Sequence, residues 1–135
     1  MSSAARSRAD VGDESAPTAG PNPAAMNAVH RQRAHLIDAV AKPLTEWIAD
    51  MHCEQDPSLE SRYGDDGFEL WRNEIRVRLM HLAEAVAVDR SELFVQNALW
   101  SRAAFLAREV DDGDLRRNLE CTRAVCEQEL PKDVA

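Results

Sequence analysis

The stretch DGFELWRNEIRVRLMHLAEAVAV, residues 66–88, decides the fold that the sequence predicts. One apolar row in it has the i, i+3, i+4, i+7 spacing of a helix face: Phe68, Trp71, Ile75, Leu79, Leu82 and Val86. A second apolar row lies on a different side of the same helix: Leu70, Val77 and Val88. A helix that is apolar on more than one side is usually surrounded by neighbours. We therefore expect this helix to occupy the middle of a helical bundle.

The segment before it predicts a long first helix with an internal irregularity. Residues 23–55 carry apolar side chains at helical spacing from Val29 to Met51. Pro43 falls inside this pattern. Because proline removes a backbone hydrogen bond and clashes with the preceding turn, we expect a kink or break near residues 41–42.

Further helices are predicted along the rest of the chain. A short helical turn is expected between Pro57 and Gly64, and two longer helices over residues 90–110 and 114–130. No segment shows the alternation typical of strands. The predicted fold is therefore all-α, either a globin-like fold or a four-helix bundle with a kinked first helix.

The sequence also predicts where two helices begin and where one helix can pack closely against a neighbour. Asp66 with Glu69, and Asp89 with Glu92, have the three-residue spacing of a capping box, so we expect helices to begin there. Small side chains in the helix after Asp89 would let a neighbouring helix approach closely: Ala98, Ser101, Ala103 and Ala104.

Length and charge restrict the class of protein. The 135 residues suffice for one domain, which we expect over residues 23–131, with a disordered tail at 1–22 and a loose end at 132–135. The net charge of −8 argues against binding to nucleic acid or to an anionic membrane, since both need a basic surface. No apolar run approaches the roughly 20 residues of a membrane span. The N-terminus lacks the apolar core of a signal peptide, so a cytoplasmic protein is expected.

The sequence contains no motif that predicts catalysis or a metal centre. It has no phosphate-binding loop, dinucleotide fingerprint, nucleophile elbow or zinc-protease motif. His30 and His35 are five residues apart, as are Cys121 and Cys126, and neither spacing suits a structural zinc site. We expect a protein that is not an enzyme, with three free thiols and no metal.

Three tryptophans and one arginine are the candidate binding residues. Trp47, Trp71 and Trp100 all fall on helical faces with other apolar side chains, which is typical of core packing. The alternative is an aromatic wall beside a large ligand, formed by Trp71 and Trp100. Arg78, on the side of Trp71, would then pair with a ligand carboxylate. Otherwise Arg78 forms a salt bridge, with Glu74 or with an aspartate at a helix start.

Several short segments between residues 35 and 131 resemble a known family. They are Arg62-Tyr63-Gly64, the segment Glu74-Ile75-Arg76-Val77-Arg78-Leu79, Leu82-Ala83-Glu84-Ala85, Glu92-Leu93-Phe94, Leu99-Trp100 and Asp114-Leu115-Arg116-Arg117-Asn118-Leu119-Glu120. The family is the globin-like, photoglobin-type sensor domain that precedes cobalamin-binding domains in some bacterial photoreceptor-like regulators. Where that family has an aromatic residue, histidine and leucine in succession, this chain has Val77-Arg78-Leu79.

The resemblance implies a non-enzymatic sensory or regulatory domain. Such a domain would hold a linear or cyclic tetrapyrrole, or dock to a cobalamin-domain regulatory protein. The predicted ligand contacts are Trp71, Arg78 and Trp100. Cobalamin itself is not expected on this chain alone, since no cobalamin-binding motif is present. The alternative is a helical interaction module that forms a homodimer or another protein complex without a ligand.

Overall fold

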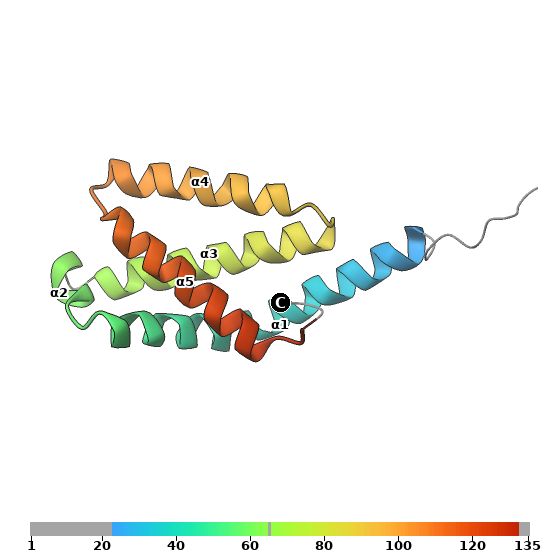
Figure 1. Ribbon diagram of the computed structural model, residues 1–135, viewed down its shortest axis with the longest axis horizontal. Coiled ribbons are helices and arrows are strands. Elements are labelled where there is room, and N and C mark those ends of the chain that lie inside the picture. The colour runs from blue at the N-terminus through green and yellow to red at the C-terminus, as the bar shows by residue number, and fades with distance from the viewer. Residues whose placement is uncertain (1–22, 65, 133–135) are drawn as a thin grey trace, which may run out of the picture.

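The computed structural model describes residues 23–64 and 66–132, so the predicted tail at 1–22 and residues 133–135 lie outside the described part. The described residues form five α-helices: α1 (Pro23–Gln55), α2 (Leu59–Tyr63), α3 (Gly67–Ala87), α4 (Ser91–Ala107) and α5 (Asp112–Glu129) (Figure 1). No strand occurs in these two ranges, which confirms the all-α prediction.

Helix α3 is the central element of the fold. It contacts all four other helices, and it lies between α4 and the C-terminal part of α1 in Figure 1. Four residues of α3 have exposures of 3% or less: Trp71, Ile75, Leu79 and Ala83. Phe68, Leu82 and Val86 are half-buried against the same core. The apolar row predicted from residues 66–88 is therefore the buried face of this helix.

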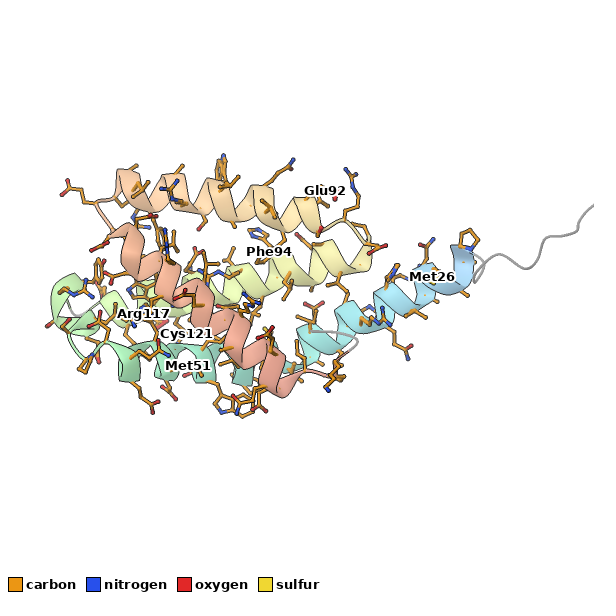
Figure 2. The ribbon with its side chains drawn as sticks, in the orientation of Figure 1. Met26, Met51, Glu92, Phe94, Arg117 and Cys121 are labelled. Atoms are coloured by element: carbon orange, nitrogen blue, oxygen red, sulfur yellow. The ribbon has the colours of Figure 1, made fainter. Side chains whose placement is uncertain are left out.

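Helix α1 is continuous through Pro43 but changes direction along its length. Figure 1 shows its N-terminal part set at an angle to the rest and extending away from the other helices, and Figure 2 shows Met26 on that part. The Thr45 hydroxyl donates to the Ala41 carbonyl at 2.7 Å, a side-chain bond that often accompanies helix bending. The sequence predicted a kink or break near residues 41–42. The helix is not broken at Pro43, and its change of direction in Figure 1 agrees with the predicted kink.

The buried side chains form two clusters. The larger joins α1, α3 and α5 and includes Ile37, Ile48, Ile75, Leu79 and Val125. The smaller surrounds Trp71 and joins α2, α3 and α5 to the end of α4 through Leu59, Phe105, Val110 and Leu115. Phe105 is the only residue of α4 that is fully buried. Helix α4 is thus attached to the core mainly at its C-terminal end.

The helix start predicted at Asp66 is confirmed, since Asp66 is the N-cap of α3, but its side chain makes no capping hydrogen bond. The next residue, Gly67, is packed so tightly that an added Cβ would lie 2.7 Å from the Tyr63 Cβ. Asp89 has a positive φ of 54°, and α4 begins two residues later, at Ser91. The spacing of the two acidic pairs thus located both helix starts to within two residues, although neither start has the side-chain hydrogen bond of a capping box. A side-chain cap does occur at α5, where the Asp111 carboxylate accepts from the Gly113 N–H at 2.8 Å.

Candidate functional site

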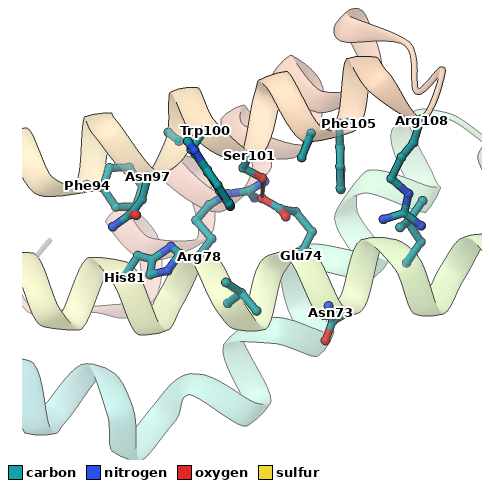
Figure 3. A pocket seen from close by; sticks show the side chains of 14 residues that line it. Asn73, Glu74, Arg78, His81, Phe94, Asn97, Trp100, Ser101, Phe105 and Arg108 are labelled. Atoms are coloured by element: carbon teal, nitrogen blue, oxygen red, sulfur yellow. Dashed lines mark hydrogen bonds and ion pairs between the residues drawn. The ribbon is translucent and has the colours of Figure 1, made fainter.

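A groove of about 260 Å³ lies between α3 and α4. Its α3 side is formed by Leu70, Glu74, Val77, Arg78 and His81. Its α4 side is formed by Phe94, Ala98, Trp100, Ser101, Ala104 and Phe105. Figure 3 shows Trp100 and Ser101 reaching from α4 toward Glu74 and Arg78 on α3.

Small side chains on the inner surface of α4 explain why this space is unfilled. Ala98, Ser101 and Ala104 line the groove. The sequence led us to expect that such residues bring two helices into close contact. Here the larger residues Phe94 and Phe105 line the groove farther along the same helix, so the small residues between them leave a cavity.

Arg78 lies beneath the groove in a buried polar network. Its side chain is 4% exposed. Nη1 donates to Asn118 Oδ1 at 2.5 Å and to Thr122 Oγ1 at 2.8 Å, both on α5. Nη2 donates to Glu74 Oε2 at 3.2 Å, and the same oxygen accepts from Ser101 Oγ at 2.7 Å. Of the two roles the sequence left open, the structure gives Arg78 the salt bridge with Glu74.

The network extends to His52 and fixes its tautomer. Since Arg78 can only donate, Asn118 Oδ1 must be the acceptor, which leaves the Asn118 amide nitrogen to donate. It lies 2.9 Å from His52 Nδ1, so Nδ1 is the acceptor and the proton of a neutral imidazole is on Nε2. Protonation of Nδ1 would place two donors against each other. The core therefore favours the neutral histidine.

We expect the protein to lose stability as the pH falls through the ordinary pKa of histidine. Burial lowers the pKa of His52 from 6.5. The negative charges of Asp114 and Asp56 act to raise this pKa, whereas the positive charges of Arg117 and Arg78 lower it further. The unfolded chain then binds a proton more readily than the folded one, so the free energy of unfolding decreases below pH 6.5. Urea unfolding at about pH 7.5 and about pH 5.5 measures this decrease.

The matched variants for this test are His52→Leu and His35→Ala. His52→Leu should remove most of the pH dependence in this range, whereas His35→Ala, at an exposed residue of α1, should retain it. The carboxyl groups whose pKa is lowered, such as Asp114, act only in a more acidic range. An unchanged slope in His52→Leu would contradict the assignment.

The three tryptophans occupy different environments. Trp71 is 1% exposed and lies in the core, with its ring against His52, Tyr63 and Phe105, and it does not line the groove. Trp100 is 80% exposed and lines the groove together with Arg78. Trp47 is half-exposed on α1. Of the three predicted contact residues, the structure brings Arg78 and Trp100 to one groove and places Trp71 behind it.

The outer surface of α4 is apolar and exposed. Trp100 is the most exposed large apolar residue of the described chain. Three further residues of the helix are between 44% and 59% exposed: Val95, Leu99 and Leu106. We call these four residues, together with Ala103, the α4 outer face. Exposed apolar surfaces of this kind are typical of sites of protein contact.

A second polar cluster, which the sequence did not reveal, joins α2 to α5. Arg62 and Tyr63 both donate to the Asp114 carboxylate, and the Tyr63 hydroxyl accepts from the Asp111 N–H at 3.1 Å. Burial acts to raise the pKa of Asp114, but the bonds from Arg62 and Tyr63 outweigh it and lower that pKa. Arg62 also pairs with Asp56. These contacts hold the short helix α2 in place, and we assign the cluster a structural role.

We also searched the described residues for metal sites, disulfides and membrane-spanning helices. Within residues 23–64 and 66–132, no three His, Cys, Asp or Glu side chains gather as a metal site would require. Cys53, Cys121 and Cys126 are free thiols, as predicted. None of the described helices is both long and apolar enough to cross a bilayer.

The chain matches no protein family, no curated protein sequence and no solved structure.

Proposed function

We propose that the chain is a non-enzymatic interaction module, an open four-helix bundle with the short helix α2 inserted, which forms a homodimer through the α4 outer face. The observation that carries this proposal is the exposure of Trp100, at 80%, and of Leu99, at 59%, on one helix. Burial of a large apolar side chain stabilises an association by about 1.5–3 kcal/mol. A partner that covers the α4 outer face would therefore bury several such side chains at once, and each would stabilise the complex.

The charge distribution permits a second copy of the chain as that partner. The protein carries a net charge of −8, so contact between two copies is opposed over most of its surface. Helix α4 contains only two charged residues, Glu92 and Arg102. Both are already paired within the chain, Glu92 with Arg90 at 3.3 Å and Arg102 with Asp112 at 2.8 Å. The α4 outer face therefore offers two copies an apolar contact without like-charge repulsion.

Symmetry and side-chain size fit the same arrangement. Most soluble homo-oligomers are twofold dimers in which the same surface meets itself. Val95, Leu99, Ala103 and Leu106 follow one another at spacings of three and four residues, which is the pattern of a helix stripe that packs on another helix. Ala103 lies within this stripe, and its small side chain allows two α4 helices to approach closely.

The substitution Leu99→Glu tests the dimer. We expect light scattering to give the mass of two chains for the wild type at high protein concentration and of one chain for Leu99→Glu, because the variant places a charge in the middle of the contact. The matched control is Met80→Glu, an exposed apolar residue on the α1 side of α3. That variant should remain dimeric. A monomeric wild type, or equal weakening by both substitutions, would overturn the proposal.

The sensor function implied by the photoglobin resemblance stays a prediction with less support. The groove holds the predicted contacts Arg78 and Trp100, which favours some ligand. Its volume of about 260 Å³ lies below the range of about 300–1,000 Å³ that is usual for drug-sized ligands, and a tetrapyrrole is a large ligand. A shifted absorption spectrum of biliverdin, heme or cobalamin on addition of the protein would be the result that supports this function.

A further inference from the structure

We propose that the groove between α3 and α4 binds a small, uncharged aromatic molecule that carries one hydrogen-bond donor. This inference concerns the groove on the inner surface of α4, and of the residues of the α4 outer face only Trp100 also lines that groove. It rests on an acceptor atom without a donor, on the charge balance around that atom, and on the size and lining of the groove.

The acceptor atom is Oε1 of Glu74. The Glu74 side chain is only 13% exposed, and its two hydrogen bonds, from Arg78 and Ser101, both end on Oε2. Within residues 23–64 and 66–132, no group donates to Oε1 at hydrogen-bond distance. The Oε1 atom is not among the fully buried side-chain atoms that lack a partner, so it keeps some contact with water, and a donor in the groove would replace that water. Glu74 lines the groove, so a molecule there can supply one (Figure 3).

Charge balance favours a neutral donor over a cation. Arg78 neutralises the Glu74 carboxylate and is held from the other side by Asn118 and Thr122. The groove therefore offers an acceptor but no unbalanced negative charge. Arg108 at one end of the lining adds a positive charge, which would repel an ammonium group. An N–H or O–H of an uncharged molecule satisfies Oε1 without this repulsion.

Size and lining favour an aromatic ring system. Phe94, Phe105 and Trp100 supply aromatic walls, and Leu70, Val77 and Ala98 supply aliphatic ones. Aromatic groups gain from edge-to-face and offset contacts with such walls. A volume of about 260 Å³ suits one or two rings rather than a larger cofactor.

The test compares indole with indene, which has nearly the same shape but no N–H. Titration of the full chain, followed by calorimetry or by amide chemical shifts, should show saturable binding of indole. We expect indene to bind at least about tenfold more weakly, because it leaves Oε1 without a donor. Equal binding of both compounds, or no saturable binding of indole up to its solubility limit, would overturn the proposal.

Two variants locate the binding. Ala98→Trp places a large side chain in the groove and should abolish indole binding, whereas Ala124→Trp, at an exposed residue of α5, should leave it unchanged. Thermal unfolding checks that both variants are folded. Leu99→Glu should also bind indole normally, because Leu99 does not line the groove. Unchanged binding in Ala98→Trp, or lost binding in Leu99→Glu, would contradict the assignment.

Discussion

Trp71→Ala should lower the free energy of unfolding by about 3–5 kcal/mol, the usual cost of removing a buried tryptophan. The side chain is 1% exposed, and its ring lies 5.2 Å from that of His52, 5.8 Å from Tyr63 and 5.4 Å from Phe105, in edge-on contacts. These rings come from α1, α2 and α4, so the cavity would weaken three helix contacts at once. Urea unfolding of the purified variant measures the loss.

Two further substitutions separate packing from the presence of tryptophan itself. Trp71→Phe should cost clearly less than Trp71→Ala, because it keeps a ring and removes an indole N–H that has no partner among the described residues. Trp100→Ala should change the stability of the isolated chain little, since Trp100 is 80% exposed. Equal losses for Trp71→Ala and Trp100→Ala would show that the core is not built around Trp71.

The contrast between Trp71 and Trp100 shows which features the sequence alone could predict and which it could not. Local periodicity was sufficient to predict α3 and its buried face, because the row from Phe68 to Val86 repeats at helical spacing. It could not distinguish Trp71 from Trp100, since both lie on apolar helix faces. Which of two apolar faces is covered depends on neighbours that are distant in the sequence.

The sequence could not predict most of the polar contacts either, because the paired residues are distant in the sequence. Arg78 binds residues 40 and 44 positions away, and Arg62 binds a residue 52 positions away. No local spacing encodes such pairs. Only the Arg78–Glu74 pair, four residues apart on one helix, was among the alternatives that the sequence offered. That only one of the two Glu74 oxygens accepts hydrogen bonds depends on Ser101, which lies 27 positions away, as well as on Arg78.

Helix α4 joins the two proposals in one physical argument. Its segment is apolar on more than one side, a pattern that usually indicates a surrounded helix. In the single chain, α3 and α5 cover only one side, and Phe105 is its one fully buried residue. The pattern is accounted for if a second copy covers the outer face and a small ligand fills the space left on the inner one.

Glu74→Ala should be the second most damaging substitution, with a loss of about 3 kcal/mol in the free energy of unfolding, because it leaves the buried guanidinium of Arg78 without its carboxylate. Urea unfolding at neutral pH measures the loss. Glu69→Ala is the matched control on the same helix: Glu69 is 64% exposed and lies 3.5 Å from Arg72, and such surface pairs contribute about 0–1 kcal/mol.

A double substitution shows whether the loss comes from an unpaired charge or from a missing contact. Glu74→Leu together with Arg78→Met removes both charges and fills similar volume, so it should cost less than Glu74→Ala alone. If the double variant is instead the less stable of the two, the bonds from Arg78 to Asn118 and Thr122 contribute more than its pair with Glu74. The Arg78 side of the groove would then be held mainly from α5.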